Sequence, residues 1–411
     1  MKRVVITGMG CVNPLGNDIN TLWDNLLKGV NGIGPITSIQ NPDLPVHVAA
    51  EVKDFDPLAL GLDKTMARRN DRYALFALAA AKQAMTDSGL VVGEHVQPER
   101  FGTAIGSGIG GIHTFIKEQT QILSEGVRRV SPLFIPMMIG NIAGANVAIM
   151  CNAQGPNLPI VTACATGTHS IGEAYRMIKE GLADAMITGG TEAAITEIAI
   201  GGFANSKALT TTDDPNAASI PFDARRHGFV MGEGAGVMIL EDYDIAVKRG
   251  ANIYAEVVGY GNTCDAHHVT APRADGKCAA ECLRLALQGA GYKGEKLYIN
   301  AHGTSTPLND KSETSAIKQA LGEEFARKAM ISSTKSMMGH MLGAAGAIEL
   351  VVSALTLKHG AIAPTINYRE ADPECDLNYT PNTAVDFGAE VAISNSFGFG
   401  GQNACVALRK I

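Results

Sequence analysis

Two segments of this chain, one at its start and one past its middle, begin in the same way, and this similarity constrains the fold more than any other feature. Each is an apolar strand that runs into Gly-x-Gly and an asparagine. Gly8-Met-Gly10 is followed by Asn13, and Gly259-Tyr-Gly261 is followed by Asn262. Internal similarity of this kind indicates a duplicated unit. We therefore predict two similar halves, 1–250 and 251–411.

Strand-like and helix-like segments alternate along both halves, which is typical of an α/β fold. The clearest helices are expected at 19–27, opened by Asp18, and at 72–88, closed by Gly89. Strands are expected at 2–7, 101–105, 159–162, 185–188, 236–240, 296–299 and 391–395. The strand at 391–395 runs into a glycine-rich turn, and we interpret it as the counterpart of the strand at 159–162.

Charge and composition disfavour several classes of protein. The formal net charge of −7 argues against nucleic acid as a partner. No apolar run approaches the roughly 18 residues that a membrane span needs, and Gly8 and Gly10 interrupt the apolar N-terminus. The eight cysteines are scattered without a Cys-x-x-Cys pair, so we expect neither a metal site nor disulfides. Free thiols fit a reducing cytoplasm.

One cysteine stands where an α/β enzyme can place a nucleophile. Cys164 follows the expected strand at 159–162 and precedes a helical pattern that buries Ile171, Ala174 and Ile178. Unpaired N–H groups and the positive end of the helix dipole favour a thiolate at such a position. From position alone, a nucleophile and a buried structural cysteine both remain open.

Two histidines also stand at element ends beside glycine. His302 follows the strand at 296–299 in Asn-Ala-His-Gly-Thr-Ser-Thr-Pro, and His340 begins an apolar helix in Met-Gly-His-Met-Leu-Gly. The turn Ser-Phe-Gly-Phe-Gly-Gly near 398–401 can turn its N–H groups toward a ligand oxygen, and no Gly-Lys-Ser/Thr of a phosphate loop follows it. The loop 106–111 fits Gly-x-Gly-x-x-Gly, but no second strand that ends in an acid follows, so no dinucleotide is expected there.

Taken together, these motifs resemble those of the β-ketoacyl-acyl-carrier-protein synthases of the thiolase superfamily, synthase II in particular. The motifs appear in the family's order: Thr-Ala-Cys-Ala-Thr-Gly, Ala-His-Gly-Thr-Ser-Thr-Pro, Ser-Thr-Lys-Ser with Gly-His and Gly-Ala-Ala-Gly-Ala-x-Glu, and Asn-Ser-Phe-Gly-Phe-Gly-Gly. The resemblance implies a thiolase-like fold of five layers, α-β-α-β-α, built from two similar halves, and a homodimer.

The resemblance also implies a reaction, the decarboxylative Claisen condensation that elongates fatty acids by two carbons. A fatty acyl thioester would pass from an acyl carrier protein to Cys164 and then condense with malonyl-carrier protein, releasing carbon dioxide. The phosphopantetheine belongs to the carrier protein, so no cofactor of the chain's own is implied. A cytoplasmic enzyme is expected, with neither nucleic acid nor a membrane as a partner.

Roles for individual residues follow from the resemblance. Catalysis would use Cys164 as nucleophile, His302 and His340 as neutral Nε2–H donors, and Lys335 as their support. The N–H groups of Cys164 and Phe399 would hold the oxyanion. Residues implied for the gating turn and for support are Gly398, Gly400, Gly401, Glu349 and Asn403. Residues implied for substrate and carrier contacts are Thr304 and Thr306 for pantetheine, Ile109 and Phe134 for the acyl pocket (Phe134 from across the dimer), and Arg68, Arg69, Arg128, Arg129 and Lys207 for the carrier protein.

Two positions depart from the family pattern: Gln402 stands where threonine or histidine is commoner, and Met338 where threonine is usual. Neither removes a catalytic group, but both leave chain-length preference open. A type II polyketide ketosynthase would share the same residues. A non-catalytic chain-length factor is disfavoured because Cys164 is present. A thiolase would need a second cysteine as base, for which Cys405 is the candidate. A cysteine hydrolase would need a histidine oriented by Asn300 or Asn395.

Overall fold

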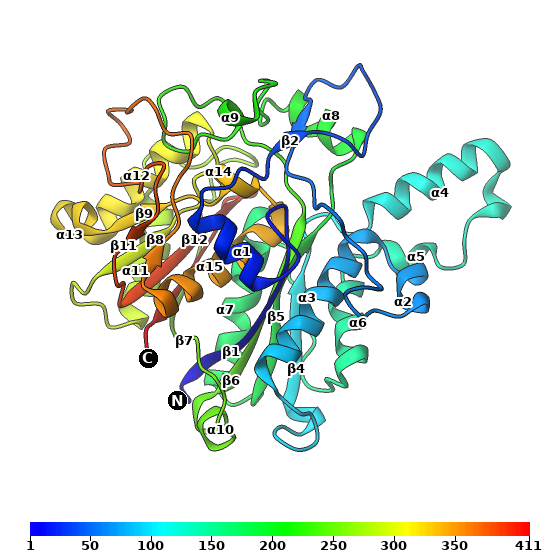
Figure 1. The fold of residues 1–411 in the computed structure, drawn as a ribbon, viewed down its shortest axis with the longest axis horizontal. Coiled ribbons are helices and arrows are strands. Elements are labelled where there is room, and N and C mark those ends of the chain that lie inside the picture. Colours follow the sequence, from blue (N-terminus) through cyan, green and yellow to red (C-terminus); the bar gives the residue numbers. More distant parts are fainter.

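Nine strands form one large sheet in the computed structural model, which describes residues 1–411 (Figure 1). In spatial order the strands are β4 (Phe101–Gly106), β5 (Ala185–Glu192), β6 (Gly234–Asp242), β1 (Val4–Val12), β7 (Ala255–Cys264), β13 (Gln402–Arg409), β12 (Val391–Gly398), β8 (Leu297–Asn300) and β9 (Met330–Ser332). Two small sheets pair β2 (Gly34–Pro35) with β3 (Val48–Ala49) and β10 (Ala361–Ile362) with β11 (Val385–Asp386).

The two similar segments of the sequence form β1 and β7, which lie side by side at the centre of the large sheet. They pair antiparallel through three residues only, Val4 to Ile6 on β1. Outward from β1 and from β7 the pairing repeats: two antiparallel steps, β1–β6–β5 and β7–β13–β12, and then a parallel one, β5–β4 and β12–β8. The sheet runs unbroken through β1 and β7, so the boundary at residue 250 stays a prediction.

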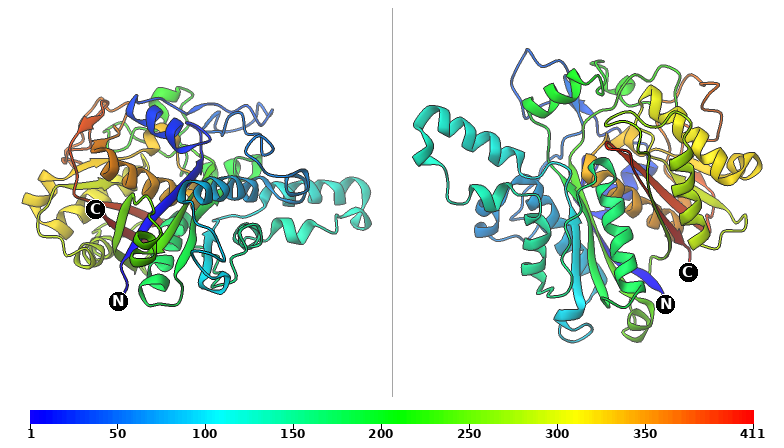
Figure 2. Two further views of the ribbon diagram at one scale, coloured as in Figure 1. Left: turned by 60° about the horizontal axis from the view of Figure 1, so that its bottom comes forward. Right: turned by 180° about the vertical axis from the view of Figure 1, so that it is seen from behind.

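Helices lie between and outside the two halves of the sheet. α7 (Thr166–Lys179) and α15 (Ala345–His359) each contact strands of both halves and form the central layer. α3 (Arg72–Ser88) and α6 (Ile142–Cys151) cover the outer face of the first half, while α11 (Lys277–Gly289), with α12 (Pro307–Leu321) packed on it, covers the second (Figures 1 and 2). This arrangement is the predicted five-layered α-β-α-β-α fold.

The remaining helices and turns connect these layers. They are α1 (Ile19–Leu27), α2 (Lys64–Arg69), α4 (Ile112–Glu125), α5 (Phe134–Met138), α8 (Glu197–Asn205), α9 (Pro215–Ala218), α10 (Tyr243–Lys248), α13 (Glu323–Lys328), α14 (Lys335–Met338), and the 3-10 turns η1 (Pro98–Arg100), η2 (Val127–Arg129), η3 (Ala163–Ala165) and η4 (Leu342–Ala344). Two predicted helix ends are confirmed. Asp18 caps α1 by accepting from the Thr21 N–H at 2.9 Å, and α3 ends at Gly89 with a φ of +61°.

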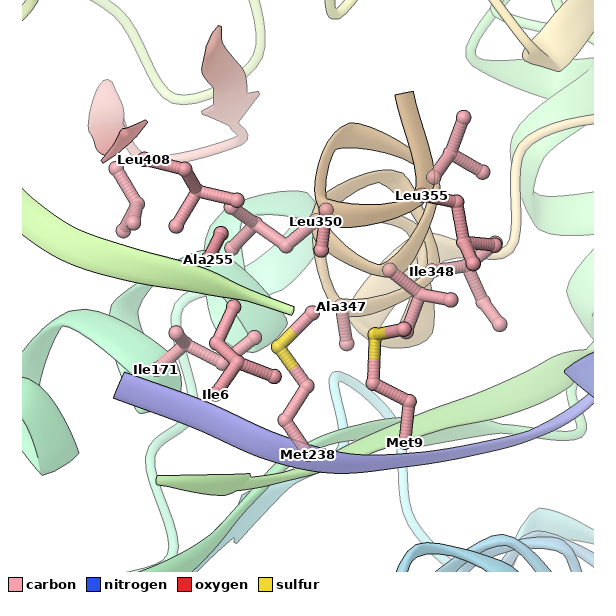
Figure 3. Packing of buried hydrophobic residues seen from close by; sticks show 14 of the residues in the cluster. Ile6, Met9, Ile171, Met238, Ala255, Ala347, Ile348, Leu350, Leu355 and Leu408 are labelled. Carbon is pink, nitrogen blue, oxygen red and sulfur yellow. The ribbon is translucent and has the colours of Figure 1, made fainter. Parts of the chain in front are cut away.

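The central helix α15 is largely apolar, and every residue from Ala345 to Leu357 is buried. Figure 3 shows Ile348 and Leu350 reaching toward Met9 and Met238 of the first half-sheet and toward Ala255 and Leu408 of the second. The expectation that no apolar run reaches the length of a membrane span is wrong: the segment Leu342–His359 is long and apolar enough to cross one, but 89% of it is buried inside the protein. It is therefore the core helix of the fold.

The strand predicted at 159–162 is wrong. The chain runs beside β4 just before this segment and makes one bridge to it, between Asn157 and Thr103, but it makes none within 159–162. Pro156 and Pro159 lack the N–H groups that a ladder needs, so the pairing cannot continue. The predicted likeness to 391–395 is also wrong, since β12 occupies in its half the place of β5. The segment 157–162 corresponds instead to β9.

Candidate active site

A cavity of about 390 Å³ brings together the three residues that the sequence marked most strongly. Cys164, His302 and His340 all line it, although they come from three separate elements. Cys164 lies in η3, directly before α7. His302 follows β8, and His340 lies in the segment between α14 and η4 rather than at a helix start as predicted.

Cys164 is held against the end of β12. A Cβ placed on Gly398 would lie 2.7 Å from the Thr162 carbonyl oxygen and 3.2 Å from the Cys164 nitrogen, so only glycine allows this approach. The backbone N–H groups of Phe399 and of Cys164 itself both act on the sulfur. The resemblance implied that these two N–H groups bind the oxyanion, and in the structure both point toward the nucleophile.

The resting form of Cys164 differs from the prediction. Burial raises the pKa of the thiol to about 12; the positive charge of Lys335 and the two N–H groups lower it, and Glu192 raises it. The thiolate expected from the helix N-terminus is therefore not the resting form, because removing the sulfur from water disfavours its charge more than these groups favour it. The proton must leave during acyl transfer.

We expect the alkylation rate of Cys164 by iodoacetamide to climb steadily with pH. Because the thiolate is the reactive form and the pKa lies near 12, the rate should rise about tenfold per pH unit from about pH 7 to 10. The measurement is mass spectrometry of the Cys164 peptide, which separates it from exposed Cys264. A plateau above neutral pH would contradict the raised pKa.

The two histidines face each other across the cavity wall. Their ring centroids lie 5.2 Å apart with an interplanar angle of 86°, and both side chains are buried. Burial, and then the charge of Lys335, lower the pKa of each well below its usual value; for His302 the neighbouring His340 lowers it further. Both rings are therefore neutral at neutral pH, and a neutral imidazole can donate through one nitrogen only.

Lys335 and Glu349 form a buried ion pair beneath the cavity. The ammonium group of Lys335, only 2% exposed, contacts Oε1 of Glu349. Burial raises the pKa of Glu349, and Lys335 opposes that rise. The charge of Lys335 acts on both histidines and on Cys164. The lysine thus helps keep the imidazoles neutral, as its implied role requires.

The glycine-rich turn after β12 is fastened to a loop that the sequence did not mark. Gly400 and Gly401 have φ values of +86° and +74°. The Gly400 N–H donates to the Val269 carbonyl at 2.7 Å, the Asp265 N–H donates to the Gly401 carbonyl at 2.8 Å, and Asn403 Nδ2 donates to Asp265 Oδ1 at 2.8 Å. Asn403 therefore supports the turn through Asp265, which only the folded chain reveals.

A second residue missed from the sequence is Glu313, which lies under His302. Its carboxylate accepts the N–H groups of His302 at 2.8 Å and of Gly303 at 2.7 Å, and Asn395 Nδ2 donates to it at 3.2 Å. Burial raises its pKa to about 7. The sequence did contain a signal for this residue. Asp310, Glu313 and Ile317 are spaced to share one face of α12, so two acidic residues lie on its buried face.

The residues implied for substrate contacts are only partly brought together. Thr304 and Thr306 line the cavity with their hydroxyl oxygens 2.9 Å apart. Ile109 lies in the loop after β4 and is 41% exposed. Phe134, on α5, packs near Phe115 and does not line the cavity of its own chain. Gln402 pairs with Gly398 at the base of the glycine turn, and Met338 is buried.

The five basic residues implied for docking lie in three places. Arg68 and Arg69 are exposed on α2, Arg128 and Arg129 are exposed on η2, and Lys207 stands at the mouth of the cavity after α8. Arg129 is ion-paired with Glu125 at 2.9 Å. Only Lys207 therefore adjoins the site within one chain.

Comparison with known proteins gives consistent matches over the chain. Residues 1–246 match the β-ketoacyl synthase N-terminal domain family and residues 254–369 its C-terminal domain family. The chain is 51% identical to 3-oxoacyl-[acyl-carrier-protein] synthase 2 of Staphylococcus aureus and 50% identical to that of Synechocystis, covering 100% of this chain and 98% of each relative. Among solved structures, a β-ketoacyl synthase from Burkholderia phymatum superposes with a TM-score of 0.92 at 34% identity over 100% of both chains. A type II polyketide ketosynthase in complex with its acyl-carrier protein, bound to the hexaketide, also gives 0.92 at 34%, over 100% of this chain and 99% of that one.

Proposed function

The chain belongs to the β-ketoacyl synthase family, and on that premise we propose that it works as a 3-oxoacyl-[acyl-carrier-protein] synthase II. It condenses an acyl chain held on Cys164 with malonyl-carrier protein and elongates fatty acids by two carbons. The observation that carries this proposal is the single cavity that holds Cys164, two neutral histidines and two backbone N–H donors.

In the first half-reaction the sulfur of Cys164 attacks the carbonyl carbon of the acyl thioester. The carbonyl oxygen becomes an oxyanion, which the N–H groups of Cys164 and Phe399 stabilise. The carbon–sulfur bond to pantetheine then breaks, and the departing pantetheine sulfur ends as a thiol with the proton that Cys164 gave up. Thr304 and Thr306 are placed to hydrogen-bond the pantetheine amides.

In the second half-reaction malonyl thioester loses carbon dioxide. The electrons of the broken carbon–carbon bond form an enolate, and the N–H donors of His302 and His340 stabilise its oxygen. The enolate carbon then attacks the acyl carbonyl carbon on Cys164. Collapse of that adduct releases the 3-oxoacyl thioester and returns the Cys164 sulfur, which takes up a proton from water.

The test of this function is an elongation assay. Incubating the protein with acyl- and malonyl-carrier protein should yield one carbon dioxide for each 3-oxoacyl product. Hydrolysis of the acyl thioester without elongation would refute the proposal. A polyketide role is less well supported, since identity is 51% to the synthase 2 relative and 34% to the polyketide ketosynthase.

Contacts within the protein disfavour the other two rivals. Cys405, the candidate base of a thiolase, is fully buried in β13 and does not line the cavity. Asn300 donates to the Glu349 carbonyl oxygen and Asn395 to Glu313, so neither amide orients a histidine as a cysteine hydrolase requires.

We expect the carrier protein to dock on the exposed arginines of α2 and η2, because carrier proteins are acidic. Arg68→Glu and Arg128→Glu should each raise the KM for carrier-bound substrate about tenfold and leave a pantetheine mimic unaffected. Arg176→Glu, a charge reversal at an arginine on α7 that is paired with Glu173, is the matched control. Equal losses on both substrates would refute docking at these arginines.

A homodimer is the proposed assembly. Figure 1 shows α4 and α5 projecting from the body as an arm, and apolar side chains on and near it are exposed. They are Phe115, Leu123, Val127, Ile135, Ile149, Leu158 and Val161. A second copy would cover them and could bring Phe134 to a neighbouring cavity. Sedimentation should give twice the chain mass, and Val161→Asp should shift it toward a monomer.

The enzyme is further proposed to act in the cytoplasm without a cofactor of its own. All eight cysteines are free thiols. The phosphopantetheine arm arrives with the carrier protein, and the cavity has residues placed to receive it. Protein dialysed against a chelator should therefore keep full elongation activity.

A further inference from the structure

The residue that ends β5, Glu192, is a fully buried carboxylate without a cation beside it. Its Oε1 accepts the Ser107 hydroxyl at 2.7 Å and the Ile109 N–H at 3.2 Å. Its Oε2 accepts the Gly108 N–H at 2.8 Å and the Gly343 N–H at 3.0 Å. Four donors, three of them from the backbone, thus satisfy one carboxylate in place of an ion pair.

These contacts explain Gly108 in the Gly-x-Gly-x-x-Gly sequence at 106–111, whereas Gly106 packs against the Ile160 carbonyl oxygen and Gly111 against the Met137 carbonyl oxygen. Successive N–H groups in such a loop form a concave site for an anion. Here the Glu192 carboxyl group accepts the N–H groups of Gly108 and Ile109, so a side chain of the protein itself fills this site. The loop is therefore built to be held by this side chain.

Three backbone segments meet around the carboxylate so closely that side chains are excluded. A Cβ on Gly108 would lie 2.8 Å from Glu192 Oε2, and a Cβ on Gly343 would lie 2.8 Å from it and 2.5 Å from the Gly108 nitrogen. A Cβ on Gly190 would lie 2.3 Å from the Gly343 carbonyl oxygen. Glu192 therefore joins the loop after β4 to the turn η4, which follows His340.

The held loop carries Ile109, whose side chain is 41% exposed, although its N–H is bound to Glu192. The same carboxylate lies near enough to Cys164 to raise the pKa of its thiol. Movement of the Ile109 main chain relative to the nucleophile thus requires the loop to part from Glu192.

We propose that Glu192 is a positioning residue that holds Ile109 in its resting place and so limits how readily Cys164 accepts long acyl chains. This inference rests on the proposed function, since it deepens the role of Ile109 at the acyl pocket. A loop held by three hydrogen bonds, from Ser107, Gly108 and Ile109, resists the movement that a long chain demands, whereas a short chain needs no such movement.

The test is Glu192→Gln, which keeps the shape of the side chain. Each carboxylate oxygen accepts at least one backbone N–H, so whichever way the glutamine lies, its NH₂ group faces a backbone donor and that contact is lost. Acyl-enzyme formation is measured by mass spectrometry with dodecanoyl- and butanoyl-carrier protein. The ratio of the dodecanoyl to the butanoyl rate should rise about fivefold over wild type.

Glu241→Gln is the matched control, because Glu241 is a fully buried carboxylate on β6 that is bound to Arg249 and Thr7, away from the cavity. It should leave the ratio unchanged. An unchanged ratio in folded Glu192→Gln protein would overturn the inference and leave the proposed function standing. Failure of wild type to load either chain would instead overturn the proposed function. If Glu192→Gln does not fold, Ser107→Ala removes one donor and should raise the ratio about twofold, and no rise there overturns the inference.

Discussion

Replacing Cys164 with alanine is expected to abolish both acyl-enzyme formation and chain elongation. The backbone N–H groups of Cys164 and Phe399 both act on this sulfur. His302 and His340 are neutral hydrogen-bond donors rather than nucleophiles. Without a covalent acyl carrier, the enolate formed from malonyl thioester has no acyl group to attack. Intact-protein mass spectrometry and the elongation assay measure the two losses.

The control for this substitution is Cys264→Ser. Cys264 is exposed beside the glycine turn and accepts the Ala266 N–H at 3.4 Å, but it does not line the cavity. This variant should load acyl groups at the wild-type rate. An acyl adduct on Cys164→Ala protein, or elongation by it, would show that the nucleophile has been assigned to the wrong residue.

Local signals in the sequence predicted much of the fold because they act within a few residues. Asp18 and Gly89 fixed helix ends through bonds to neighbouring backbone groups. The alternation of strands and helices along the chain predicted the layered α/β fold. The strand expected at 159–162 failed because the apolar run that begins at Pro159 resembles a strand, yet Pro156 and Pro159 lack the N–H groups that a ladder needs. Leu158 and Val161 are exposed, and the proposed homodimer would cover them.

The residues that the sequence did not reveal act across long separations. Glu192 binds the loop at 107–109 and Gly343, which are distant in sequence, and Asp265 binds Asn403. Buried carboxylates that are satisfied by backbone N–H groups leave no pattern of partner side chains to find. The resemblance to the family implied roles for Lys335 and Glu349, but only the structure shows that they form a buried ion pair. Supporting groups were thus the part of the site least accessible from sequence.

Replacing His302 or His340 with alanine is expected to lower elongation by about 10²–10³-fold, because each substitution removes one donor to the enolate oxygen, a loss of about 2.7–4 kcal/mol of transition-state stabilisation. Acyl transfer to Cys164 should be largely spared, since the N–H groups of Cys164 and Phe399 serve that step. Carbon dioxide release from malonyl-carrier protein and acyl loading, measured separately, give the two rates.

His169→Gln is the matched control for the histidine substitutions. His169 is also a buried histidine, but it bonds Thr162 and Asn262 on the far side of η3 and does not line the cavity. If this substitution slows the enzyme, it should slow acyl loading and decarboxylation by the same factor. Loss of acyl loading in His302→Ala or His340→Ala equal to the loss of decarboxylation would contradict the division of labour, because the histidines would then act on the thiol. Combining both alanine substitutions should cost less than the sum of the two, since the donors share one oxygen.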